Sequence, residues 1–188
     1  MEPARRRKAS RPLDEGSLNE LALRYVGRFA TTRAKLRSYL ARKVRERGWE
    51  GAREPNVAAI AERFADQGYV DDSAYALAKS QSLTVRGYGK QRVMQTLRAA
   101  GVEAEDGSAA RSHAEEEAVS AALRFARRRR VGPYGAAELR DPKERQKALA
   151  AMVRAGHGFG LARAILELPP GTEVNIEQLS EHIRLTDA

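Results

Sequence analysis

Two stretches of this 188-residue chain follow one frame: KQRVMQTLRAAG at residues 90–101 and RQKALAAMVRAG at residues 145–156. Each begins with a basic residue, a glutamine and a second basic residue, and each ends in Ala-Gly. The copies begin 55 residues apart, and a weaker copy begins 57 residues earlier, at Arg33, where Leu40 matches Leu97. Any two amphipathic helices share some likeness, but here helix, break and glycine stop recur in the same order. Such repetition is typical of tandem helical units.

Apolar residues on both sides of the repeated stretch recur at spacings of three and four, which predicts helices. Thr32, Asn56 and Asp141 are suitable caps, and Gly48, Gly68, Gly101 and Gly156 are suitable stops. We expect the following residues to face inward: Leu18, Leu21, Ala22, Tyr25, Val26, Phe29, Leu36, Leu40, Val44, Val93, Met94, Leu97, Leu149, Met152 and Val153. Residues 103–117 are acidic and poorly patterned, and no segment alternates with period two, so we expect no sheet.

The predicted fold is all-α, with three tandem three-helix modules that form an elongated, curved array. A single unit of this size cannot bury its apolar stripe alone, so neighbouring units must cover it, and one continuous core strip is expected. The domains are a disordered basic arm (1–16), module 1 (17–70), module 2 (71–114), module 3 (115–168) and an acidic tail (169–188). Ile176, Leu179 and Ile183 could place one more short helix in that tail.

Composition narrows the classes of partner. The formal net charge is +9 and the pI about 10.2, which favours a polyanion or an acidic protein surface. The absence of cysteine excludes disulfides and thiolate metal sites. No apolar run reaches the roughly 18–20 residues of a membrane span, and no apolar stretch follows the basic N-terminus. We therefore expect a cytoplasmic protein, without membrane partners, that acts as a monomer.

Four motifs stand in order along the chain, and together they resemble the RecX family, the bacterial regulators of the RecA recombinase. They are Thr32-Arg33-Ala34-Lys35-Leu36; Gly68-Tyr69-Val70-Asp71-Asp72 followed by Tyr75-Ala76; Arg86-Gly87-Tyr88-Gly89 with Leu97 and Gly101-Val102; and Gly156-His157-Gly158-Phe159. The resemblance covers about residues 17–168. It implies three tandem three-helix modules, binding in the groove of the RecA–single-strand DNA filament, and inhibition of recombinase and coprotease activity in DNA repair and the SOS response.

The motifs that could belong to a catalytic or metal site each have a simpler structural explanation. Gly87-Tyr88-Gly89-Lys90 lacks the spacing and the following hydroxyl residue of a phosphate loop. The histidines at 113, 157 and 182 lack metal-ligand spacing. Asp71-Asp72 reads as a helix start rather than as a metal or acid–base pair. We therefore expect no enzymatic activity, no metal and no cofactor.

Basic residues gather on the copies of the repeat, which suits a charged helical polymer as partner. The candidate contact residues for the filament or DNA are Arg33, Arg37, Arg42, Lys43, Arg86, Tyr88, Lys90, Arg92, Arg98, Arg127, Arg128, Arg145 and Lys147. Arginines at the end of a helix also complement its dipole, so the run at residues 127–130 has a partly structural interpretation. The alternative function is a free-standing basic helical protein that binds single- or double-stranded DNA, although the low aromatic content argues mildly against dedicated single-strand binding. A generic scaffold is the third possibility.

Overall fold

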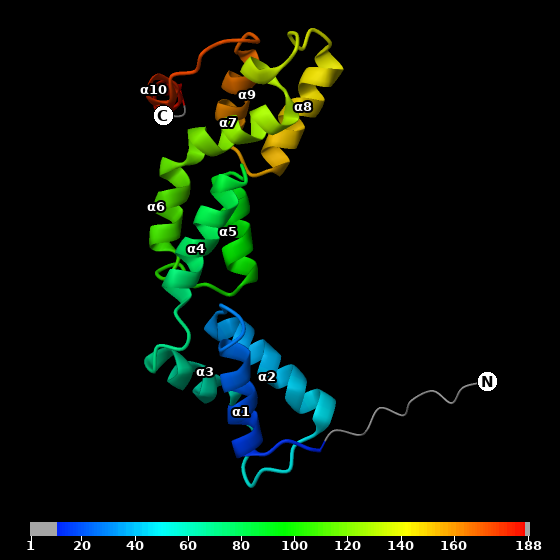
Figure 1. Ribbon diagram of the computed structural model, residues 1–188, viewed down its shortest axis with the longest axis vertical. Coiled ribbons are helices and arrows are strands. Elements are labelled where there is room, and N and C mark those ends of the chain that lie inside the picture. Colours follow the sequence, from blue (N-terminus) through cyan, green and yellow to red (C-terminus); the bar gives the residue numbers. More distant parts are fainter. Residues whose placement is uncertain (1–10, 187–188) are drawn as a thin grey trace, which may run out of the picture. The chain divides into compact units, whose positions relative to one another are not determined.

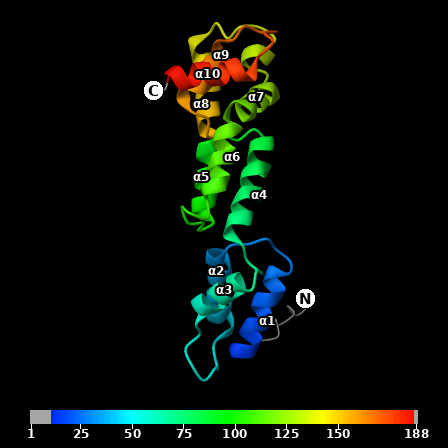
Figure 2. The same cartoon turned by 90° about the vertical axis from the view of Figure 1, so that its left-hand side faces the viewer.

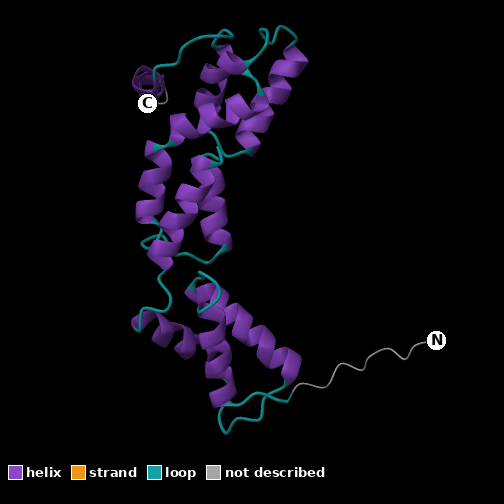
Figure 3. Ribbon diagram, viewed as in Figure 1, coloured by secondary structure: helices purple, strands orange, loops and turns teal. Residues whose placement is uncertain are grey.

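The computed structural model describes residues 11–186, and within them the chain is all-α, as predicted (Figures 1 and 3). No strand occurs in this range beyond one isolated bridge between Leu13 and Trp49. The helices are α1 (Glu15–Val26), α2 (Arg33–Arg47), α3 (Val57–Asp66), α4 (Asp72–Val85), α5 (Lys90–Ala99), α6 (Ser108–Glu116), α7 (Ala118–Arg129), α8 (Pro142–Arg154), α9 (Phe159–Glu167) and α10 (Ile176–Thr186), with a 3₁₀ turn at Gly132–Tyr134.

The chain divides into two compact units, and the boundary between them in the sequence falls between Asp72 and Ser73. The first unit has one hydrophobic cluster, to which α1, α2 and α3 contribute leucines, alanines, Ile60 and Phe64. The second unit has two clusters, one among α4, α5 and α6 and one among α7, α8 and α9. The buried residues thus fall into three clusters and not into the one continuous core strip that was expected, although the half-buried Tyr88 packs against both clusters of the second unit.

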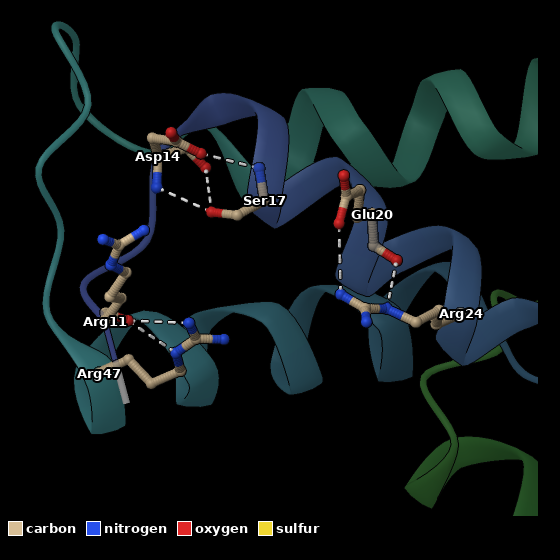
Figure 4. A network of polar contacts seen from close by, with 6 residues as sticks. All are labelled: Arg11, Asp14, Ser17, Glu20, Arg24 and Arg47. Carbon is tan, nitrogen blue, oxygen red and sulfur yellow. Dashed lines mark hydrogen bonds and ion pairs between the residues drawn. The ribbon is translucent and has the colours of Figure 1, made fainter. Parts of the chain in front are cut away.

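The first unit begins earlier than the sequence indicates. Leu13 is fully buried, and its backbone N–H and C=O bond to Gly48 and Glu50. Asp14 caps α1 by accepting from the Ser17 N–H at 2.7 Å, and the Ser17 hydroxyl accepts from the Asp14 N–H (Figure 4). The bond from the Ser17 N–H, and next a side-chain hydrogen bond with Ser17, lower the pKa of the Asp14 carboxyl. The prediction of a disordered arm over residues 1–16 is thus wrong for residues 13–16, and residues 1–10 lie outside the described part.

The N-terminus of α2 is held twice. The Thr32 hydroxyl accepts from the Lys35 N–H at 3.1 Å, which confirms the predicted cap. The buried Asp72 carboxylate accepts from the Arg33 N–H at 2.9 Å. Two of the N–H groups that every helix leaves unpaired at its start are therefore satisfied, and a negative charge sits at the positive end of the helix dipole.

In the second unit, residues 103–117 contain a helix that the sequence pattern does not reveal. α6 buries only alanines, Ala110 and Ala114, and the Ser80 hydroxyl donates to the Ala110 carbonyl at 2.9 Å. Small side chains give close helix packing but little amphipathic contrast, which explains the weak signal. α6 extends to Glu116, so the expected boundary between residues 114 and 115 falls inside it.

The repeated frame identifies one position that is buried in every middle helix. Leu40 in α2, Leu97 in α5 and Met152 in α8 occupy this position and are at most 1% exposed. The expected inward placement of Val153 is wrong, because this residue is 43% exposed. Leu149 is only partly buried. The inward face of α8 is therefore narrower than the sequence suggests.

The two glycine-containing loops of the second unit pack against each other. The Gly89 N–H donates to the Ala155 carbonyl at 3.0 Å, and the Gln91 N–H donates to the Gly156 carbonyl at 3.1 Å. A Cβ on Gly89 would lie 2.3 Å from the Gly156 oxygen. His157 is buried at this junction, and its Nε2 lies 3.2 Å from the Gly87 carbonyl. The Gly87-Tyr88-Gly89 motif is thus a backbone junction between the loop before α5 and the end of α8.

The tail does form the short helix that its apolar spacing allows. α10 contacts α7 and α9 (Figure 2). Leu179 and Ile183, together with Val174 before the helix, pack against the cluster of α7, α8 and α9. The Gly171 N–H donates to the Pro133 carbonyl at 2.9 Å, which fixes the chain between α9 and α10. The acidic tail is therefore part of the second unit.

We expect Leu97→Ala and Met152→Ala each to lower the free energy of unfolding by ~2–5 kcal/mol, because each truncation leaves a cavity in a small cluster. Val153→Ala, one residue away on the exposed face, should change it by less than ~0.5 kcal/mol. Urea unfolding followed by circular dichroism measures all three. Equal losses for Met152 and Val153 would contradict the orientation of α8.

We expect Gly89→Ala to destabilise the chain by ~1–3 kcal/mol more than Gly158→Ala does, because the new methyl group would collide with backbone atoms of Gly156. The comparison is matched, since both glycines cap a helix start in an extended conformation, and no atom lies within 4 Å of a Cβ built on Gly158. Thermal melts of both variants measure the difference. Identical melting temperatures would show that the junction tolerates a side chain.

Candidate functional site

The first basic residue of each repeat copy bonds to other residues of its own unit. Arg33 in α2 lies 3.5 Å from carboxylate oxygens of Asp72 and Glu62. Lys90 in α5 forms an ion pair with Glu115 of α6, which lowers the pKa of that carboxyl. Arg145 in α8 donates to the Leu139 carbonyl at 2.9 Å. These three predicted contact residues therefore hold each middle helix to a neighbouring segment of its own unit.

The second basic residue of each copy has a different environment. The Arg92 side chain is exposed, and among the described residues it bonds to Gln95 of its own helix, at 2.9 Å. Lys147 is exposed and has no partner among the described side chains. Lys35, the equivalent residue of the first copy, lines a surface groove. In the second and third copies this position therefore carries an exposed positive charge without an acidic partner in the described range.

The other candidates fall into three groups. Arg42 and Lys43 share Glu46, with N–O distances of 2.8 and 2.6 Å, and these hydrogen bonds lower the pKa of the Glu46 carboxyl. The guanidinium of Arg86 lies over the half-buried Tyr88 ring, and Arg128 donates to the Arg86 carbonyl. Three exposed candidates have no side-chain partner in the described range: Arg37, Arg98 and Arg127.

A surface groove between α1 and α2 is the most developed site of the first unit, with a volume of about 990 Å³. Eleven residues line it: Leu21, Arg24, Tyr25, Arg28, Phe29, Lys35, Ser38, Tyr39, Arg42, Arg45 and Arg47. Six of these are basic and none is acidic. The groove therefore joins positive charge with aromatic surface, a combination suited to an anionic ligand that has flat rings.

The aromatic residues of the groove form one contiguous group. The rings of Tyr25 and Tyr39 stack at a centroid distance of 4.2 Å and an angle of 14°, and Phe29 lies 5.4 Å from Tyr25. Phe29 is 53% exposed, so its expected inward placement is wrong. Sequence reasoning missed this site because the spacing of Tyr25 and Phe29 on one helical face is equally typical of core residues.

Cations surround these rings, and several are fixed in place. The guanidinium of Arg28 lies 5.8 Å from the Phe29 centroid, and that of Arg42 lies 5.6 Å from the Tyr39 centroid. Figure 4 shows two further groove cations with their partners: Arg24 bonds to the carbonyl and carboxylate of Glu20, and Arg47 donates to the Arg11 carbonyl at 2.8 Å. Arg28 and Arg45 have no carboxylate partner in the described part of the chain.

Among the side chains that the structure describes, no group of three or more His, Asp or Glu residues could hold a metal ion. Burial lowers the pKa of the His157 imidazole, as does the nearby Arg128 charge, while its bond to Gly87 opposes the shift. His157 packs edge-on against Phe125, which places it in the core junction. No described helix is long and apolar enough to cross a bilayer.

The fold and surface define the class: an all-helical protein made of two compact units that carry basic outer surfaces and a basic aromatic groove. Comparison with known proteins narrows this class to one family. A regulatory protein RecX of Myxococcus xanthus is 32% identical over 87% of this chain and 91% of its own length, and one of Agrobacterium fabrum is 31% identical over 73% and 74%. The chain belongs to the RecX family of regulatory proteins. No family model matches it.

Solved structures agree on the fold. A crystal structure of RecX from Lactobacillus salivarius superposes with a TM-score of 0.56 at 16% identity, covering 90% of this chain and 96% of that chain. A second crystal structure of a regulatory protein RecX gives 0.57 at 22% identity, covering 80% and 71%. At these identities the likeness shows a shared helical fold.

We expect Asp72→Ala to lower the free energy of unfolding of the first unit by ~1–3 kcal/mol, because the Arg33 N–H would lose its acceptor in a buried place. Glu62→Ala removes the other carboxylate near Arg33, but that carboxylate is exposed and should contribute less than ~1 kcal/mol. Chemical denaturation compares the two variants. An equal loss for both would mean that Asp72 acts only as a countercharge for the Arg33 side chain.

Proposed function

We propose that this chain is a regulator of homologous recombination and DNA repair that binds the filament formed by the RecA recombinase on single-stranded DNA. In this proposal it mostly inhibits recombinase and coprotease activity, and it acts in the cytoplasm by binding, without a reaction of its own. Membership of the RecX family is the observation that carries the proposal. The net charge of +9 supports it, because the filament contains a polyanion.

The second basic residue of the repeated frame identifies a candidate binding surface for this proposal. Arg92 and Lys147 stand at equivalent places in α5 and α8, and both are exposed and without an acidic partner in the described range. Equivalent charges on successive helical groups suit a partner that itself repeats. Arg33, Lys90 and Arg145 contribute less to this surface, because their charges are already engaged inside the protein.

We expect the wild-type chain to inhibit the RecA ATPase on single-stranded DNA, and the double variant Arg92→Glu/Lys147→Glu to need roughly tenfold more protein for half inhibition. Both residues are exposed, so the variant should remain folded. The matched control is Arg53→Glu/Arg140→Glu, which changes the net charge equally at exposed positions outside the repeated helices.

Two outcomes would contradict this expectation. Equal weakening by the control variant would mean that only net charge matters. Binding to naked DNA and to the filament that weakens in parallel as salt rises would favour the second candidate, a free-standing DNA-binding protein, which the basic aromatic groove of the first unit also supports.

A further inference from the structure

We infer that the groove between α1 and α2 binds single-stranded nucleic acid, with an unpaired base stacked on Phe29 and phosphates paired with the surrounding cations. The inference deepens the proposed function and rests on it for its setting in the filament. Binding of a naked strand, however, is a property of the groove itself and can be measured without a recombinase.

The exposure of Phe29 is the first step. A phenylalanine that is half exposed places apolar surface in water, and here it ends a row of rings whose other members, Tyr25 and Tyr39, are partly buried. Tyr25, which stacks on Tyr39, lies next to the exposed ring, with a centroid distance of 5.4 Å between Tyr25 and Phe29. An exposed aromatic ring is a platform on which nucleobases stack, since every base has a π face.

Charge is the second step. The groove lining has six cations and no carboxylate, and two acidic side chains that contact the lining, Glu20 and Glu46, are already paired with basic residues. Arg28 and Arg45 have no acidic partner among the described residues and lie on opposite walls, one on the segment after α1 and one in α2. A ligand with negative charge along its length would find cations on both sides of the rings.

The combination selects a single strand. A duplex satisfies a cationic groove as well as a single strand does, but its base faces are stacked on one another and cannot reach a protein ring. An acidic peptide satisfies the charges but has no flat faces for Phe29. Of these three partners, only an unpaired strand uses both features, so we assign this occupant.

The test measures fluorescence anisotropy of a labelled oligothymidylate with the full chain, and of a duplex of equal length. We expect Phe29→Ala to weaken single-strand binding roughly 5- to 150-fold, the range of one base–aromatic stack, and to leave duplex binding unchanged. Phe29→Trp should retain single-strand binding. Leu23→Ala is the matched control, because Leu23 is 51% exposed on α1 but does not line the groove.

The salt dependence of the binding affinity separates the contribution of the rings from that of the charges. Arg28→Gln/Arg45→Gln should reduce the slope of log affinity against log salt by about 1.4 for a single strand, since about 0.7 is lost for each phosphate contact. Phe29→Ala should leave that slope unchanged. Far-ultraviolet circular dichroism checks that each variant is folded.

Three results would overturn the inference: unchanged single-strand affinity in Phe29→Ala, equal weakening in Leu23→Ala, or displacement of the oligonucleotide by polyglutamate of matched charge as effective as that by unlabelled oligonucleotide. The last result would assign the groove to an acidic protein surface. If Phe29→Ala loses strand binding while the wild-type chain fails to inhibit RecA, the proposed function fails and the stacking site stands. If inhibition is intact but the chain binds no naked strand, the stacking site fails alone.

Discussion

The backbone N–H groups at the start of the middle helices are the constraint on which the rest of the structure depends. Each helix leaves its first N–H groups without partners, and the small alanine-rich clusters provide little apolar surface to offset that cost. In α2 the partner is Asp72, which lies 39 residues further on. In α5 it is the carbonyl of Gly156, which ends α8. In α2 and α5, partners for these N–H groups thus come partly from residues far along the chain, and they set which elements must lie together, whereas Asp141 caps α8 locally.

The glycine at the end of α8 shows how one residue serves two helices. Gly156 has a φ of +93°, the left-handed conformation that closes a helix, and the His157 N–H reaches back to the Met152 carbonyl. The same turn directs the Gly156 carbonyl to the first turn of α5. Gly89 must lack a side chain for this close approach of the two backbones. The glycine motifs of the sequence are therefore explained by a steric constraint.

Local rules predicted the helices well, because their signals are contained in neighbouring residues. Thr32, Asn56 and Asp141 do cap α2, α3 and α8. The failures all depend on partners far along the chain. Leu13 is buried because it pairs with the segment around Trp49, and α6 is stabilised by packing of alanines against α4 and α5. Neither contact leaves a periodic pattern in the sequence.

Only part of the candidate site could be predicted from the sequence, for a related reason. From the sequence alone, every arginine and lysine is an equal candidate for a partner contact. The structure shows that Arg33, Lys90 and Arg145 are engaged within their own units. Composition likewise displays a low average of aromatic residues, 6%, which argues against single-strand binding. An average says nothing about position, and three of the rings lie together in one basic groove.

The repeat also indicates that this groove is a specialised feature of the first unit. Counting along the repeated frame, the position of Tyr39 in α2 is occupied by Thr96 in α5 and by Ala151 in α8. Neither residue can extend a row of rings. The second basic residue of the frame, by contrast, is present in all three copies as Lys35, Arg92 and Lys147. The row of rings is therefore confined to the first unit, and under the inference above only this unit stacks an unpaired base.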